Sequence, residues 1–256
     1  MTTTFTPDYA RALVQPSPNH GERKESREPD MILLHYTGMP DDDQALSWLC
    51  DPASEVSCHY FVYPDGRVIQ LVPESERAWH AGKSFWGGDT DINSCSIGIE
   101  IANPGHPAGL PDYPDAQIEA VIALCADISA RRYIPRERVL AHSDVAPVRK
   151  ADPGENFPWA HLAEAGIGHY VEPTPITGGR FFQQGDGGQP VEALQSMLAF
   201  YGYGIEITGI FCATTEGVVQ AFQRHFRPQQ VDGIADMSTI DTLHRLLVSQ
   251  PRLAVA

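Results

Sequence analysis

The chain has 256 residues, 42% of them apolar and 20% charged, which is typical of one large globular domain or two unequal ones. Its formal net charge of −15 argues against a nucleic-acid partner, because the phosphates would be repelled. No run approaches the roughly 18 apolar residues of a membrane helix, so we expect no membrane span. Five scattered cysteines indicate buried, reduced thiols rather than a disulfide framework or a Cys-rich metal site.

Residues 1–29 are rich in Pro, Ser and charge, and they predict an irregular arm over the surface. This segment lacks the apolar stretch behind a basic start that marks a secretory signal peptide. On that ground we expect a cytoplasmic protein, unless a leader has been removed from the chain.

Strands and helices alternate over residues 30–170 and predict an α/β domain with a central mixed β-sheet flanked by helices. Apolar runs, alternation and turn residues predict strands in four segments, the second of them a hairpin. These segments are residues 31–38, 57–72, 94–103 and 138–143. Carboxylates ahead of apolar residues predict a helix start at 41–43, and helical spacing of apolar residues predicts a helix over 115–133.

The rest of the chain predicts a second, smaller unit. Residues 171–188 are dense in Pro and Gly, which is the composition of a linker. A helical pattern begins at 190–203, and two more follow it. We therefore expect a small three-helix C-terminal domain over residues 189–250.

This small unit contains a weak internal repeat. Two glycine turns lie 24 residues apart, at Gly209 and Gly233, and an amphipathic helix follows each of them. We expect Thr214 and Ser238 to cap the two helices, because a hydroxyl group at that place accepts a bond from a free backbone N–H group.

Three polar residues could supply a zinc site, since a zinc hydrolase needs a few His or carboxylate ligands and an open coordination position. His35 and His142 each follow an apolar strand, where the sheet opens to solvent. Asp152 lies beyond a proline-turned loop that begins at His142. Because the chain has 10 histidines, spacing alone leaves open that these two are hydrogen-bonded core residues.

Glu100 and Lys150 are the candidate proton-transfer and charge-stabilising groups. The isoleucines of strand 94–103 share one face, and Glu100 lies on the other. A carboxylate in such an apolar strand is costly unless it is paired or functional, and near a metal it could pass a proton from water to a leaving nitrogen. Lys150 could stabilise an oxyanion. The alternatives are a solvent-exposed glutamate and a solvated loop lysine.

Other residues near this pattern have less defined roles. His59 alternates with its neighbours in the hairpin and is interpreted as a packed histidine rather than a ligand. His80 lies in a loop with Trp79, Phe85 and Trp86, and these three aromatic residues belong either to the core or to a wall against a sugar. Arg149 is interpreted as a structural or substrate-facing neighbour of the site.

The chain resembles the N-acetylmuramoyl-L-alanine amidases of the amidase-2 type over residues 30–165. The resemblance rests on four segments in one order: LLHYTG, SCHYFVYPDGRVIQLVPESERAWHAGKSFW, INSCSIGIEIAN and LAHSDVAPVRKADPGENFPW. The run HSDVAPVRKADPG in the last segment is the most specific. The resemblance implies a mixed sheet flanked by helices, similar to the fold of the peptidoglycan recognition proteins.

The same resemblance implies a role for each candidate residue. The family's Zn²⁺ ligands correspond to His35, His142 and Asp152, an aspartate where some relatives use cysteine. The catalytic glutamate corresponds to Glu100, and the lysine that stabilises the oxyanion corresponds to Lys150. Substrate contacts are expected from four further residues, of which the first could instead fix a loop: Asn93, His80, Trp79 and Arg149.

The C-terminal unit resembles the small helical peptidoglycan-binding module that is often attached to wall hydrolases. Together the two resemblances imply hydrolysis of the amide between the lactyl group of N-acetylmuramic acid, or its anhydro form, and L-alanine of the stem peptide. Peptidoglycan or its muropeptide fragments would be the partner, and such a module also favours a periplasmic or cell-envelope location. Two alternatives stay open: a non-catalytic peptidoglycan receptor on the same fold, and a zinc endopeptidase of the stem peptide.

Overall fold

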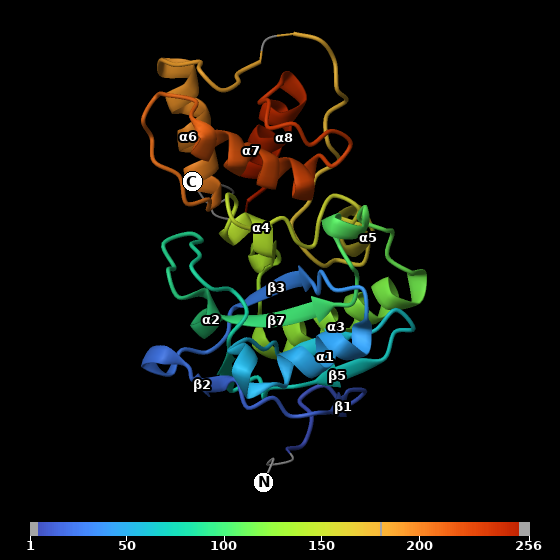
Figure 1. Ribbon diagram of the computed structural model, residues 1–256. Coiled ribbons are helices and arrows are strands. Elements are labelled where there is room, and N and C mark those ends of the chain that lie inside the picture. Colours follow the sequence, from blue (N-terminus) through green and yellow to red (C-terminus); the bar gives the residue numbers. More distant parts are fainter. Residues whose placement is uncertain (1–4, 180, 251–256) are drawn as a thin grey trace.

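The computed structural model describes residues 5–179 and 181–250, and it has two lobes (Figure 1). One lobe holds the strands together with helices α1 to α5, and the other holds α6, α7 and α8. Residues 1–4 of the predicted arm, residue 180 of the predicted linker and residues 251–256 lie outside the described ranges. Within those ranges, the helices are all too short or too polar to cross a membrane.

A six-stranded mixed sheet forms the centre of the larger lobe, as predicted. Its order is β1-β5-β4-β7-β3-β8, with β4 and β5 antiparallel and all other neighbours parallel. The strands are β1 (Leu13–Val14), β3 (Met31–Tyr36), β4 (Tyr60–Val62), β5 (Val68–Gln70), β7 (Ser96–Ile101) and β8 (Val139–Ala141). Because β7, β3 and β8 run parallel side by side, their carboxyl ends meet at one edge of the sheet.

Eight α-helices are present in the described residues: α1 (Asp42–Leu49), α2 (Ile92–Cys95), α3 (Asp115–Arg132), α4 (His142–Val145), α5 (Trp159–Glu164), α6 (Gln189–Tyr201), α7 (Ala213–Phe226) and α8 (Met237–Ser249). The predicted strand at 138–143 is therefore shorter than expected, because the chain turns into α4 at His142. The short 3-10 turns are η1 (Lys24–Ser26), η2 (Pro52–Ser54), η3 (His106–Ala108) and η4 (Arg136–Arg138).

The side chains of β7 alternate between the apolar core on one face of the sheet and a polar region on the other. Ile97, Ile99 and Ile101 are fully buried in one apolar cluster with α3, as their alternation predicted. Glu100 points to the opposite face, where it pairs in register with His35 of β3. Because side chains alternate along this strand, one face of the sheet belongs to the core and the opposite face can carry the residues of the candidate site.

Residues 5–29 are not the wholly irregular surface arm that was predicted, because parts of them pair with the sheets. These parts are β1, which pairs with β5 in the main sheet, and β2 (His20–Glu22), which pairs with β6 (Glu76–Ala78). Arg23 is buried and donates hydrogen bonds to the backbone oxygens of Glu74, Ser94 and Ser96. Polar composition predicted exposure here, but these polar groups satisfy the carbonyls at the ends of other strands.

The caps predicted for the two repeat helices are wrong. Helix α7 begins at Ala213 and α8 at Met237, so Thr214 and Ser238 lie inside the first turns. Asp236 caps α8, because its carboxylate accepts a 2.7 Å hydrogen bond from the backbone N–H of Thr239. The N-cap position of α8, which the sequence pattern assigned to Ser238, is therefore occupied by Asp236.

The repeat itself is present and has a physical basis. A buried glutamine on one helix fixes the glycine turn that leads to the next helix. Gln195 accepts hydrogen bonds from the two backbone N–H groups of residues 208–209, each at 2.9 Å. Gln223 accepts from those of residues 232–233, at 3.0 and 2.9 Å. Each buried side-chain amide therefore satisfies backbone groups that the turn would otherwise leave without partners.

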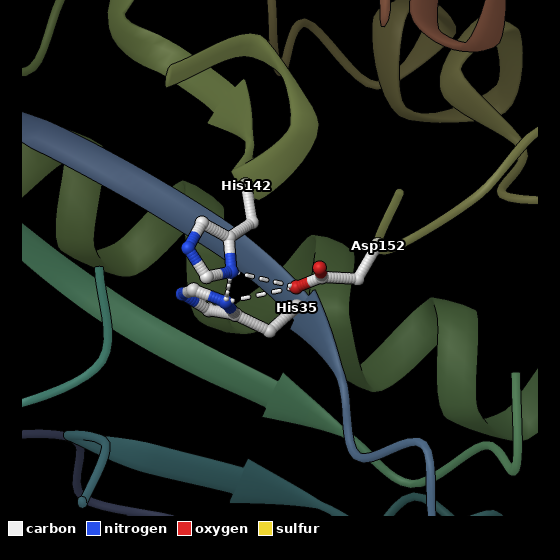
Figure 2. Close-up of side chains that lie close together, drawn as sticks. All are labelled: His35, His142 and Asp152. Atoms are coloured by element: carbon white, nitrogen blue, oxygen red, sulfur yellow. Dashed lines mark hydrogen bonds and ion pairs between the residues drawn. The ribbon is translucent and has the colours of Figure 1, made fainter. Parts of the chain in front are cut away.

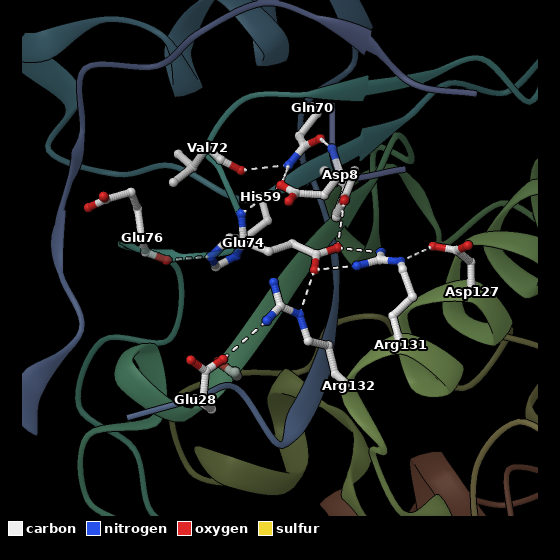
Figure 3. A network of polar contacts seen from close by, with 12 residues as sticks. Asp8, Glu28, His59, Gln70, Val72, Glu74, Glu76, Asp127, Arg131 and Arg132 are labelled. Carbon is white, nitrogen blue, oxygen red and sulfur yellow. Dashed lines mark hydrogen bonds and ion pairs between the residues drawn. The ribbon is translucent and has the colours of Figure 1, made fainter. Parts of the chain in front are cut away.

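A buried carboxylate, Glu74, holds α3 against the sheet (Figure 3). Arg131 donates two hydrogen bonds to it at 2.7 and 2.8 Å, and Arg132 donates a third at 2.9 Å. The hydroxyl of Tyr60 donates a fourth at 2.7 Å. Burial alone would raise the pKa of Glu74, but these hydrogen bonds outweigh it and lower the pKa to about 2.

We predict that Glu74→Gln lowers the free energy of unfolding by about 3 kcal/mol at pH 7, because it removes the buried anion that the partly exposed guanidinium groups of Arg131 and Arg132 bind. The folded-state pKa lies below the unfolded value of about 4.3, so this stabilisation is complete above that pH. It is lost as the pH falls towards 2, and the two proteins should converge there. Denaturant unfolding at pH 7 and pH 3 measures both effects. The control is Glu28→Gln, since Glu28 pairs with Arg132 but its side chain is 84% exposed.

Candidate functional site

Three predicted ligands meet at the carboxyl edge of the sheet (Figure 2). His35 lies near the end of β3, His142 opens α4 directly after β8, and Asp152 closes the loop that follows. The Nδ1 atoms of the two histidines are 2.9 Å apart, and the Asp152 Oδ2 atom lies 3.1 and 2.9 Å from them. All three residues are at least 95% buried. The structure thus brings together residues that are far apart in the sequence.

The Nδ1 atoms of both histidines are the inner nitrogens, which face Asp152, and the Nε2 atoms are the outer ones. Both Nε2 atoms have hydrogen-bond partners, and these partners determine whether the Nδ1 atoms carry a proton. The Nε2 atom of His142 lies 3.0 Å from the backbone oxygen of Ala81, a pure acceptor, so that nitrogen carries the proton. The Nε2 atom of His35 lies 3.1 Å from Nδ1 of His80 and can donate to it. Burial and the neighbouring imidazole of His142 lower the pKa of His35 to about 4, which keeps its ring neutral.

The three inner atoms are therefore two imidazole lone pairs and a carboxylate oxygen. Atoms that only accept cannot satisfy one another, and a buried group of this kind fits a cation placed between them. Two imidazoles and one carboxylate form a donor set that binds zinc-like metals and leaves a coordination position open. The donor chemistry thus matches a metal centre and does not match a pair of hydrogen-bonded core histidines.

Glu100 lies beside this group on the neighbouring strand, in register with His35. Its Oε2 atom is buried and has no hydrogen-bond partner among the described residues. Burial, together with the nearby charge of Asp152, raises the pKa of the Glu100 carboxyl well above its usual range. Glu100 as a whole is half-buried, and one of its carboxylate oxygens is shielded from solvent in the wall of a pocket, so it is not the freely exposed glutamate of the alternative.

That pocket has a volume of about 570 Å³ and the three candidate ligands lie in its wall. Lys150, Trp79, His80 and Arg149 also line it, as the sequence predicted for residues near the site. Trp48 and Val56, which sequence reasoning did not select, add apolar surface to the same wall. Exposed aromatic and aliphatic side chains beside polar groups are the usual lining of a ligand site.

Two of the predicted substrate contacts hold the loop at residues 80–83 in place. The amide oxygen of Asn93 accepts from the backbone N–H groups of His80 and Ala81, at 3.0 and 2.8 Å. Arg149 donates to the backbone oxygens of Ala81 and Lys83, at 2.6 and 2.9 Å. Of the two roles expected for Asn93, the geometry matches loop fixing. Both residues thereby position the carbonyl that orients His142.

His59 and Trp86 lie in the packed interior. The Nδ1 atom of His59 accepts from the backbone N–H of Gly98 at 2.9 Å, as expected for a packed histidine. Trp86 packs against Tyr201 and Tyr203 of the smaller lobe, so it belongs to the core, and of the predicted aromatic wall only Trp79 faces the pocket. Sequence reasoning could not separate these residues, because all lie in segments of similar composition.

Comparison with known proteins places the chain in a family. The sequence profile of the N-acetylmuramoyl-L-alanine amidases matches residues 25–155. The chain belongs to the N-acetylmuramoyl-L-alanine amidase family. A second profile, described as a peptidoglycan binding domain, matches residues 187–243. N-acetylmuramoyl-L-alanine amidase AmiD of Escherichia coli K12 is 41% identical over 224 residues, which cover 82% of this chain and 79% of AmiD.

Two solved structures resemble both lobes of this chain. One is E. coli AmiD in complex with the substrate anhydro-N-acetylmuramic acid-L-Ala-D-gamma-Glu-L-Lys, with a TM-score of 0.74 and 38% identity, covering 88% of this chain and 91% of that one. The other is AmpDh3 of Pseudomonas aeruginosa in complex with anhydromuramic pentapeptide, with a TM-score of 0.69 and 29% identity. That match covers 95% of this chain and 97% of the relative.

We predict that the wild-type protein holds a single metal ion at this site and that His142→Ala does not retain it. Removing one of three ligands leaves two donors, which bind a divalent metal too weakly to survive dialysis. Elemental mass spectrometry of the dialysed proteins measures the ratio of metal to chain. The matched control is His161→Ala, which removes an exposed histidine on α5 and should retain the metal. Equal metal content in the two variants would count against the site.

Proposed function

We propose that the protein is a zinc-dependent N-acetylmuramoyl-L-alanine amidase. The bond cleaved joins the lactyl group of N-acetylmuramic acid, or of its anhydro form, to L-alanine of the stem peptide. The observation that carries this proposal is the group of three inward-facing acceptors with the buried carboxyl of Glu100 beside it. The two relatives solved with anhydromuramoyl peptides support the substrate class.

The residues of the pocket have separate tasks in this reaction. His35, His142 and Asp152 would hold the Zn²⁺ ion, which polarises a carbonyl and lowers the pKa of water when bound. Glu100, whose carboxyl pKa is raised by burial and by the nearby charge of Asp152, takes the proton of the attacking water and returns it to the leaving nitrogen of L-alanine. Lys150 places a positive charge where the carbonyl oxygen gains negative charge.

Two other functions are compatible with the same fold. A non-catalytic receptor has no use for a set of metal ligands or for a shielded carboxylate oxygen next to it, and this chain has the residues for both. A zinc endopeptidase of the stem peptide would use the same chemistry on a different amide. The products separate these functions, because an endopeptidase leaves L-alanine attached to the sugar and an amidase releases it with the peptide.

We predict that Glu100→Gln lowers kcat by about 10²- to 10⁴-fold on a soluble muropeptide, because the amide cannot accept the proton of water. Bound zinc should remain, since Glu100 is not a ligand. Mass spectrometry of the released stem peptide measures the rate. Glu119→Gln is the matched control, because Glu119 lies on the exposed side of α3 and its loss should change nothing. If the wild-type protein with zinc releases no free stem peptide, the proposal is wrong.

We further propose that the C-terminal module binds peptidoglycan, and the profile match over residues 187–243 supports this. The place of action, cytoplasm or cell envelope, is linked to the size of the substrate. An enzyme that recycles wall fragments should prefer soluble anhydro-muropeptides, whereas one that acts in the envelope should also cleave intact sacculi. Rates on the two substrates, compared at equal concentrations of stem peptide, distinguish these cases.

A further inference from the structure

The smaller lobe contacts the turn that carries the metal ligand His142. Asp144 lies two residues after it, and its carboxylate is fully buried. One carboxylate oxygen accepts from the backbone N–H of Ala141 at 2.8 Å and from Nδ1 of His225 at 2.7 Å. The other oxygen accepts from the hydroxyl of Tyr203 at 2.7 Å. Asp144 therefore ties the backbone on both sides of His142 to the C-terminal module.

The donors from the module are held rigidly. His225 of α7 is 2% exposed, and its ring stacks between Trp159 and Phe226 with ring centroids 3.7 and 3.8 Å away. Tyr203 is 1% exposed and packs edge-on against Trp86 at 4.9 Å. Neither side chain can swing away from Asp144 without breaking this packing.

Two of the three donors to the buried carboxylate thus come from the module. A buried carboxylate is costly unless hydrogen bonds satisfy it, and charge-assisted bonds of this length are the strong kind. Without His225 and Tyr203, Asp144 would have only the backbone N–H of Ala141 among the donors that the structure shows. Its best response would be to move towards solvent, and the turn that carries His142 would move with it.

A second line of contacts joins the same helix to the pocket wall. The hydroxyl of Tyr36, which lines the pocket, lies 3.0 Å from Nδ1 of His106. The Nε2 atom of His106 lies 3.0 Å from Glu155, which follows the Asp152-Pro-Gly turn. Arg224 of α7 lies 3.7 Å from that carboxylate. Helix α7 therefore reaches both ends of the ligand loop, at adjacent positions 224 and 225.

We propose that the C-terminal module is a positioning element of the metal centre, with His225 and Tyr203 as positioning residues that act through Asp144 on His142. This role is additional to wall binding, and it rests on the proposed function for its catalytic consequence. The smaller lobe is then part of the amidase site although it contributes no ligand. A hydroxyl deep between the lobes should control metal affinity.

The test compares Tyr203→Phe with Tyr201→Phe in the full-length zinc protein. Both variants lose one buried hydroxyl from the same interface, but the hydroxyl of Tyr201 bonds to His169 at 2.9 Å and does not contact Asp144. For Tyr203→Phe we expect about a tenfold weaker zinc affinity, measured by competition with a fluorescent chelator. We also expect a lower kcat on soluble muropeptide with KM nearly unchanged, partly restored by excess zinc. Tyr201→Phe should keep the wild-type zinc affinity and kcat.

Thermal unfolding of both variants separates positioning from loss of fold, because all assays are made well below the lower midpoint. If the two variants show equal zinc affinity and equal kcat, the inference is overturned, whatever their thermal midpoints. If Tyr203→Phe loses zinc affinity but the wild-type protein releases no stem peptide, the positioning role stands and the proposed function fails. If the wild-type protein cleaves the substrate and the Tyr203→Phe variant has the same zinc affinity and kcat, the proposed function stands and the positioning role is wrong.

Discussion

Three hydrogen-bond acceptors lie close together in a buried place, and the structure around them must hold them there. His35, His142 and Asp152 bring two imidazole lone pairs and a carboxylate oxygen within 4.8 Å of one another in a buried place. Atoms of this kind repel unless a cation lies among them, so the surrounding structure must hold them together. The parallel order of β7, β3 and β8 provides two of the positions, because it brings the carboxyl ends of β3 and β8 side by side. The same order places Glu100 beside His35.

The third position depends on a loop that satisfies its own polar groups. The backbone N–H of Ser143 donates to the backbone oxygen of Asp152 at 3.0 Å, which closes the loop at its base. The backbone N–H of Lys150 donates to the oxygen of Ala146 at 2.9 Å and makes a tight turn inside it. Gly154 has a φ of +85°, and a side chain there would come within 2.9 Å of Leu110. Backbone hydrogen bonds within the loop and the glycine that follows Asp152 therefore hold Asp152 against the sheet.

Local patterns in the sequence predicted much of this arrangement. Alternation along β7 predicted both the buried isoleucines and the opposite placement of Glu100, and the apolar runs predicted the strands that end near His35 and His142. Nothing local predicted the parts that depend on distant partners. Arg23 satisfies carbonyls that lie about 50 to 70 positions along the chain, so its burial is invisible in a window of composition. The sequence around His225 does not indicate its role for the same reason, because its partner Asp144 is 81 positions away.

The predicted linker is also not a free spacer, although its composition favours that interpretation. Its Pro and Gly content is typical of a spacer between independent units, yet Thr174 donates to Asp241 of α8 and accepts from Ser238. One apolar cluster joins Met31 and Leu33 of β3 to Leu198 and Phe222 of the module. The alternate residues of β3, Ile32 and Leu34, lie in the cluster with α3, so the two faces of the central strand belong to different apolar clusters, and one of these continues into the module.

Because the C-terminal module shares an apolar cluster with the larger lobe, it cannot move freely relative to that lobe. Its apolar side chains and its contacts with the turn of His142 belong to one packed interior, and opening them would expose apolar side chains of that shared cluster to water. Any surface by which the module holds peptidoglycan is therefore fixed in distance and direction from the pocket. For the proposed function, wall binding would then select which stem peptides reach the pocket, because the glycan strand held by the module must also lie within reach of a pocket at a fixed distance from it.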